Sequence, residues 1–102
     1  MTKRDLAMRV ARQTGVNGQT ALRVIDATFD AIRNELAAGR RLEFRNFGVF
    51  ELTVRRSRPG RNSAKPEDVV VIPERVAVKF KPGKILAERV SQLKPSDVQN
   101  ND

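Results

Sequence analysis

The chain has 102 residues, of which 20 are Lys or Arg and 12 are Asp or Glu, so its formal net charge is +8. It contains no Cys and no His, which excludes disulfides, Cys/His metal sites and catalysis by a His base or a Cys nucleophile. This length accommodates one small domain, and no apolar run is long enough to span a membrane. We therefore expect a basic binding protein with no cofactor, no metal and no enzymatic activity. Because no signal-peptide segment is recognisable, we expect it to be cytoplasmic and not bound to a membrane.

The first forty residues are typical of two helices. Thr2 and Asp5 have the spacing of a capping box, and an apolar face follows until Gly15, a natural helix stop. Asn17 can cap a second helix, in which apolar residues recur at spacings of three and four as far as residue 36. A stripe of small residues lies beside this apolar stripe. The two stripes indicate either a helix that packs on a partner as well as on a sheet, or one wide core face.

From residue 41 the apolar period changes to two, which is typical of strands. Leu42 and Phe44 alternate with charged residues, and a second alternating run returns through Phe50 after a turn at 46–48, so a β-hairpin is predicted. A third strand covers 75–81 and is ended by Pro82-Gly83, ahead of a short helix up to residue 93. Residues 95–102 are polar without periodicity, and we expect a disordered tail there.

Residues 54–76 contain too many chain breakers to build a core, yet a structureless loop of this length is unusual in a small domain. We expect instead an arm, an extension of the hairpin with its turn near 65–68 and a returning strand over 69–72. Its first half carries five basic residues and no acidic residue: Arg55, Arg56, Arg58, Arg61 and Lys65. A basic two-stranded ribbon fits a DNA groove, although a solvated charged loop is the alternative.

Further basic residues lie on the predicted body, where they could extend a track of phosphate contacts: Lys3, Arg45, Lys79, Lys81 and Lys84. Without the arm and the tail, the body is close to the smallest size at which one core suffices. Because there is no disulfide to add stability, we expect a homodimer. All five phenylalanines are predicted to be core residues, Phe47 through burial in that dimer.

Three motifs carry a resemblance: Phe47-Gly48-Val49-Phe50, Gly60-Arg61-Asn62 and Phe80-Lys81-Pro82-Gly83-Lys84. In this order they resemble the HU/IHF family of bacterial histone-like, nucleoid-associated DNA-binding proteins, over residues 1 to about 91. The resemblance implies an α+β fold in residues 1–94. It would form an intertwined dimer with a helical base, a three-stranded antiparallel sheet and β-ribbon arms that enter the minor groove and bend DNA.

The resemblance also implies roles for individual residues. The arm contacts would be Arg55, Arg58, Arg61 and Asn62, with Arg56 and Lys65 as additions. Lys3, Lys81 and Lys84 would hold phosphates, and Arg45 would reach the minor groove. The aromatic dimer core would consist of Phe29, Phe47, Phe50 and Phe80.

One position departs from the family pattern. Where the family usually has a proline that wedges between base pairs, this chain has Ser63, whose hydroxyl cannot replace an apolar wedge. The segment between Asn62 and Pro73 is one residue longer than is typical, and Pro66 could act as a displaced wedge. We therefore expect shallower or more variable bends than in proline-bearing relatives.

The function expected from these observations is that of a sequence-tolerant architectural protein which bends, coats or compacts double-stranded DNA, with the HU branch favoured. Two alternatives stay open. One is an IHF-like, site-preferring subunit that could form a heterodimer, which the run Leu42-Glu43-Phe44-Arg45 favours slightly. The other is a protein that uses the same charge to bind RNA or an anionic surface.

Overall fold

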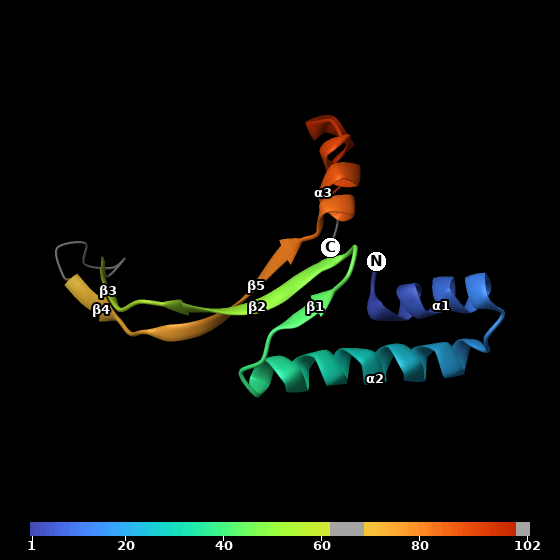
Figure 1. The fold of residues 1–102 in the computed structure, drawn as a ribbon, viewed down its shortest axis with the longest axis horizontal. Coiled ribbons are helices and arrows are strands. Elements are labelled where there is room, and N and C mark those ends of the chain that lie inside the picture. The colour runs from blue at the N-terminus through green and yellow to red at the C-terminus, as the bar shows by residue number, and fades with distance from the viewer. Residues whose placement is uncertain (62–68, 100–102) are drawn as a thin grey trace.

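The computed structural model describes residues 1–61 and 69–99 of the chain. Helices α1 (Lys3–Thr14) and α2 (Gly18–Ala37) lie side by side and lead into an antiparallel sheet of β1 (Leu42–Phe44), β2 (Gly48–Arg55) and β5 (Arg75–Pro82), in the order β1-β2-β5. A separate two-stranded ribbon pairs β3 (Arg58–Arg61) with β4 (Val69–Ile72), and α3 (Lys84–Ser91) follows the sheet (Figure 1). The predicted α+β fold with a three-stranded antiparallel sheet is confirmed.

The ends of the helices follow from local hydrogen bonds. The Asp5 N–H donates to Thr2 Oγ1 at 3.2 Å and the Thr2 N–H donates to the Asp5 carboxylate at 3.0 Å, so the predicted capping box is present. The bond from the Thr2 backbone, with that from its side chain, lowers the pKa of Asp5. At the other end, Gly15 has a φ of +75° and donates its N–H to the Ala11 carbonyl at 2.9 Å. The side-chain oxygen of Asn17 then caps α2, as predicted.

The register of β2 on β5 separates an apolar face of the sheet from a charged face, because successive side chains of a strand point to opposite sides. The cross-strand pairs on the apolar face are Phe50–Phe80, Leu52–Val78 and Val54–Val76. On the charged face, Glu51 lies opposite Lys79 and Arg55 lies opposite Arg75. The predicted alternation in both strands is confirmed.

Four phenylalanine rings form a chain of contacts on the apolar face. The centroids of Phe44 and Phe50 are 6.2 Å apart, those of Phe50 and Phe80 are 4.8 Å apart, and those of Phe80 and Phe47 are 5.6 Å apart. Aromatic pairs at such spacings add to the stabilisation that burial provides. Phe29, which lies on α2 and was predicted to share the aromatic core, takes part in none of these ring pairs.

The close approach of the Phe80 ring to the backbone explains why position 48, between Phe47 and Phe50, is a glycine. A Cβ atom at this buried position would lie 2.6 Å from the Phe80 ring and 2.7 Å from the Lys81 carbonyl oxygen. The ring therefore rests directly on the backbone of β2. Next to it, the N–H of Gly83 donates to the Phe47 carbonyl at 2.8 Å and joins the hairpin turn to the start of α3.

A single chain buries very little. Among the described residues, the buried hydrophobic side chains are those of Ala7 and Ala21. The accessible surface is 8880 Å², whereas a compact chain of this mass would expose about 5,800 Å². The radius of gyration is 19.1 Å, compared with about 13 Å for a compact domain of this size. Within one chain Phe47 is 49% exposed and Phe80 37% exposed, so the predicted aromatic core needs a covering from outside the chain.

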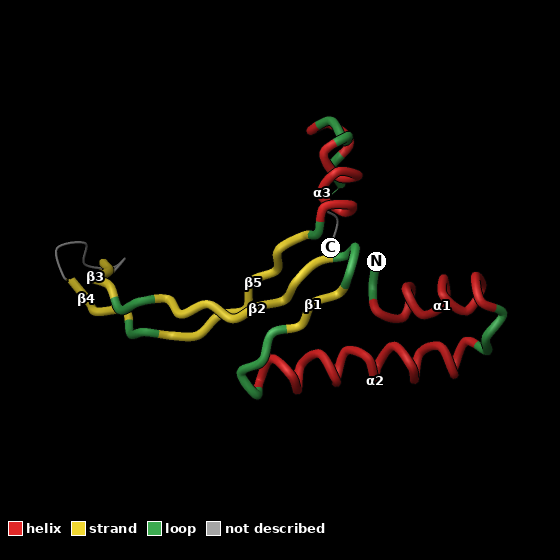
Figure 2. The backbone as a smooth tube through the Cα atoms, viewed as in Figure 1, coloured by secondary structure: helices red, strands yellow, loops and turns green. Residues whose placement is uncertain are grey.

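The ribbon of β3 and β4 projects away from the helices, as Figure 2 shows. It confirms the predicted arm and its returning strand, while the predicted turn at 65–68 lies outside the described residues. The ribbon is not continuous with the sheet, because two residues on each side, 56–57 and 73–74, belong to no strand. Pro73 accounts for one side of this interruption, since it has no N–H to continue the ladder.

At the other end of the chain, one turn of 3₁₀ helix covers Pro95–Asp97, within the segment predicted to be disordered. The Lys94 N–H donates to the Asp97 carboxylate at 3.0 Å, a local bond that the polar composition did not indicate. None of the described helices combines the length and the apolar character needed to cross a membrane.

We expect Gly48→Ala to lower the free energy of unfolding by about 1–3 kcal/mol, because the added methyl group must displace the Phe80 ring. Urea denaturation at a fixed protein concentration measures this. Gly18→Ala is the matched control, since its nearest neighbours are the flexible end atoms of Met8 at 3.2 and 3.3 Å. Equal stabilities of the two variants would contradict the role assigned to Gly48.

Candidate nucleic-acid interface

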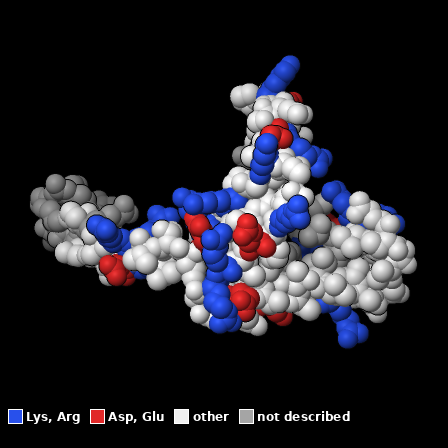
Figure 3. All heavy atoms as spheres, viewed as in Figure 1, with Lys and Arg blue, Asp and Glu red and all other residues white. Residues whose placement is uncertain are grey.

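The charged face of the sheet brings four basic side chains from two strands together: Arg55, Arg75, Lys79 and Lys81. All four are exposed. In the view of Figure 3, Lys and Arg side chains gather over the sheet and towards the arm, with Asp and Glu side chains among them in both places. Such a surface attracts a polyanion, and its acidic groups decide which cations are free to bind one.

Lys81, one of the predicted phosphate contacts, is already paired with an acid. Its Nζ lies 3.0 Å from Oε1 of Glu51, and the hydrogen bond from Lys81 holds the pKa of Glu51 below its ordinary value. An exposed ion pair of this kind is weak, and the Lys81 ammonium has three donors. A phosphate can therefore share Lys81 with Glu51 or take its place.

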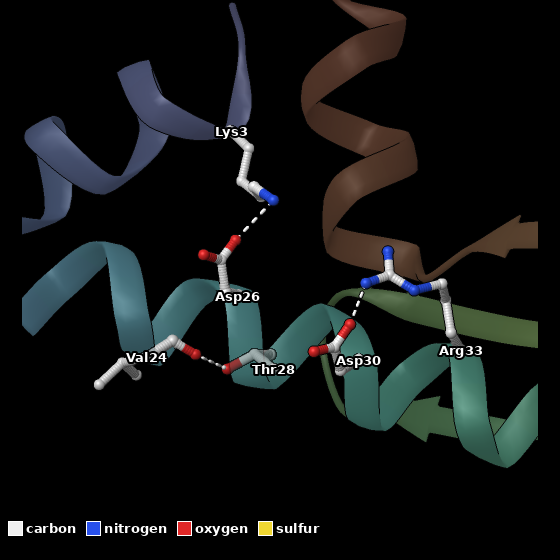
Figure 4. A network of polar contacts seen from close by, with 6 residues as sticks. All are labelled: Lys3, Val24, Asp26, Thr28, Asp30 and Arg33. Carbon is white, nitrogen blue, oxygen red and sulfur yellow. Dashed lines mark hydrogen bonds and ion pairs between the residues drawn. The ribbon is translucent and has the colours of Figure 1, made fainter.

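Lys3, at the start of α1, is also paired with an acidic side chain. Its Nζ lies 2.5 Å from Oδ1 of Asp26, and this contact joins α1 to α2 (Figure 4). On the next turns of α2, Thr28 Oγ1 donates to the Val24 carbonyl at 2.8 Å and Asp30 pairs with Arg33. Lys3 thus stabilises the pair of helices, and it keeps further donors for a phosphate.

The other predicted contacts occupy separate elements. Arg45 lies in the turn between β1 and β2, and Lys84 is the first residue of α3; both are exposed. Arg56 follows β2 at the root of the arm, and Arg58 and Arg61 are the first and last residues of β3. Asn62, Ser63, Lys65 and Pro66 lie outside the described residues. Of the predicted set, the structure brings Arg55, Lys79 and Lys81 to one face of the sheet.

Arg75 belongs to this face as well, although the sequence reasoning did not select it as a contact. It lies directly opposite Arg55 at the end of the sheet next to the arm. The sequence alternation of β5 already indicated that Arg75 faces the same side as Lys79 and Lys81, and this pattern could have identified it as a contact. Its pairing with Arg55, however, depends on the register between two strands that are distant in the sequence.

A pair of helices, a three-stranded sheet and a ribbon arm that follows a basic sheet face together define the class of protein: an architectural DNA-binding protein with β-ribbon arms. The profile of the family described as "Bacterial DNA-binding protein" matches residues 1–91. The chain therefore belongs to the HU/IHF family of bacterial, nucleoid-associated DNA-binding proteins, as its three motifs predicted.

Similar sequences include subunits of integration host factor. The chain is 39% identical over 90 residues to integration host factor subunit alpha of Xanthomonas campestris pv. campestris, covering 88% of this chain and 90% of the relative. It is 35% identical over 97 residues to the same subunit of Aeromonas hydrophila, covering 95% and 98%.

Among solved structures, an Anabaena HU–DNA cocrystal structure is similar with a TM-score of 0.84 and 30% identity, over 91% of this chain and 100% of that one. A mutant HU from Thermotoga maritima follows with a TM-score of 0.64 and 28% identity, over 88% and 99%. The two sequence relatives named here are subunits of integration host factor and the two solved structures are HU proteins, so the preference for the HU branch stays a prediction.

We expect Glu51→Gln to tighten DNA binding, because it frees the Lys81 ammonium and removes a negative charge from the interface. The slope of log K against log salt should steepen by up to about 0.9 for each lysine released. Since the pKa of Glu51 lies below its ordinary value of 4.5, the gain should be the same at about pH 6 and about pH 8.

Fluorescence anisotropy with a labelled duplex measures both quantities. The control is Glu88→Gln, which makes the same charge change on α3, where Glu88 is exposed and has no ion pair with another described residue. If the two variants gain equally, the pairing of Glu51 with Lys81 has no specific effect on binding.

Proposed function

We propose that this protein binds double-stranded DNA as a homodimer, with its arms in the minor groove and with little dependence on base sequence. We further propose that it acts on the nucleoid in the cytoplasm. The observation that carries the proposal is the continuity of charge from the sheet to the arm: Arg55 and Arg75 end the charged face at the point where the ribbon begins. The similar Anabaena HU chain comes from a cocrystal with DNA.

The chemistry of the basic side chains supports DNA binding that depends little on base sequence. Guanidinium and ammonium groups bind phosphates, which are the same at every base pair, and the minor groove distinguishes bases only poorly. Affinity should therefore come mainly from the release of counterions and fall steeply with salt. Preference among DNA targets should follow how easily the duplex deforms, and bent, nicked or gapped DNA should bind more tightly than intact duplex.

The open apolar surface supports the dimer. Val78, at the centre of the apolar face, is 56% exposed, and the phenylalanine chain beside it is partly exposed as well. A hollow of about 440 Å³ lined by Phe47 and by residues of α3 such as Ile85 and Val90 adds further apolar surface. A second copy of the chain presents the same surface, and a two-fold dimer buries both at once.

A second candidate function is that of a site-preferring subunit with a different partner, and the similarity to integration host factor subunit alpha favours it. A binding survey across many duplex sequences separates the two. Binding spread over the pool supports the sequence-tolerant homodimer, whereas a motif enriched far above the background supports the site-preferring subunit.

RNA binding is tested by competition between RNA and DNA duplexes at one salt concentration, since a ribbon fitted to B-form DNA should prefer the DNA.

We expect Val78→Glu to abolish the dimer, because it places a carboxylate in the apolar interface between the copies. Sedimentation equilibrium of the purified chain measures this. The control is Val71→Glu on β4 of the arm, where Val71 is 73% exposed, and this variant should stay dimeric. A Val78→Glu dimer as stable as that of the wild type would refute the proposed interface.

We expect the protein to raise end-to-end FRET on a labelled duplex of about 35 base pairs, and to lose this effect as salt increases. On the sequence-based hypothesis for the arm tip, Ser63→Pro should raise FRET further, because an apolar wedge unstacks a base step. If Ser63→Pro binds equally well but bends DNA no more sharply than the wild type, the hypothesis of shallower bends is wrong. Binding without any change in FRET would reassign the protein as a coating factor.

A further inference from the structure

At the root of the arm, the strand pairing is interrupted on both sides of the hairpin at the same distance from the sheet. The sheet ends with the pair Arg55–Arg75, and the ribbon resumes with the pair Arg58–Ile72. Residues 56–57 on one side and 73–74 on the other make no ladder pairs. The arm is therefore attached to the sheet by two short unpaired segments, so its direction depends on what holds these segments together.

The last pair of the sheet places two like charges opposite each other. Arg55 and Arg75 are directly opposite in the antiparallel register, and like charges in this arrangement destabilise a sheet. No described acidic side chain lies within the 4.0 Å of an ion pair from Arg55, Arg56 or Arg75. Glu74, although it is next to Arg75 in sequence, is among the acidic residues that form no such pair. An anion from outside would relieve the repulsion between the two guanidinium groups.

The same three arginines line a cavity. It has a volume of about 160 Å³ and lies between Arg55, Arg56 and Arg75, with Ile72 and Pro73 as its apolar part. This volume holds several water-sized groups, which is enough for a phosphate group. Guanidinium groups suit this ligand, because their forked donors match the oxygens of a phosphate.

We propose that this cavity at the arm root is a phosphate site that holds one backbone phosphate of the bound DNA strand. Arg55 ends β2 and Arg56 follows it in the outgoing unpaired segment, whereas Arg75 begins β5 directly after the returning one. A phosphate held between them fixes the outgoing segment against the start of β5 and so restricts the direction of the arm. The site also assigns a function to Arg75. The inference deepens the proposed function and rests on it, and a free phosphate ion has the same chemistry as the DNA backbone.

The test compares Arg75→Ala with Arg23→Ala, which removes the same charge from an exposed position on α2 away from the arm. We expect Arg75→Ala to reduce the slope of log K against log salt by about 0.9 for each chain of the dimer. At about 0.1 M salt, this corresponds to binding that is about eightfold weaker for each chain. Arg23→Ala should change both quantities by less than half as much. Without DNA, Arg75→Ala should melt at the wild-type temperature or above, because the like-charge pair is gone, so a loss of affinity cannot be attributed to misfolding.

The free ion is tested by thermal melting in inorganic phosphate and in chloride at equal ionic strength. A cavity that takes phosphate raises the melting temperature of the wild type more than that of Arg75→Ala. If the wild type binds DNA and Arg75→Ala keeps its full salt slope, the phosphate site is wrong and the proposed function stands. If the wild type does not bind DNA, the proposed function fails, and an equal rise of the melting temperature of wild type and Arg75→Ala on exchange of chloride for phosphate then overturns the site as well.

Discussion

The apolar face of the three-stranded sheet can be covered only in part by the chain that forms it. α2 contacts this sheet at β1 and β2, whereas α3 stands away from the body (Figure 1). The accessible surface exceeds that of a compact chain by about 3,000 Å², and an extended arm accounts for some of this excess but not for the open phenylalanine chain. Folding and association are therefore one process, and the stability of the protein depends on its concentration.

The need to present an apolar surface for association explains the phenylalanine and glycine residues of two sequence motifs. The Phe80 ring packs on Phe50 with the ring centroids 4.8 Å apart, and Gly48 leaves the room that the Phe80 ring needs next to the β2 backbone. The bond from Gly83 to the Phe47 carbonyl then fixes where α3 begins. Two of the three motifs that make the chain recognisable as a family member thus contain the residues that shape the apolar surface.

Charge is arranged differently on the body and on the arm. On the body, Lys81 is paired with Glu51 and Lys3 with Asp26. A phosphate that binds there exchanges with a carboxylate, so the net gain in free energy is small. At the arm root no described acid competes in this way, and a phosphate there also relieves the repulsion between Arg55 and Arg75. Each cation of the arm root should therefore contribute more to affinity than Lys3 or Lys81 does.

Local signals were sufficient to predict most of the elements. The capping box at Thr2, the left-handed Gly15 and the period-two alternation after residue 41 each act within a few residues, and the structure contains all of them. The register that places Arg55 opposite Arg75 joins positions that are 20 residues apart, and no local pattern determines it. The interruption at the arm root was missed for the same reason: Pro73 marks one side of it, but the matching gap at 56–57 follows from the pairing of the strands.

The candidate contacts were predicted less completely than the fold, because binding depends on which cations are free. Lys79 and Lys81 look alike in the sequence, but Lys81 is held by Glu51. Such pairing depends on side chains that meet across strands, whereas a family motif records only which residue types occur along one strand. Membership of a family therefore establishes the fold and the class of ligand more firmly than it establishes individual contacts. Arg75 illustrates this difference: it lies outside the three motifs, and only the strand pairing brings its guanidinium to the root of the arm.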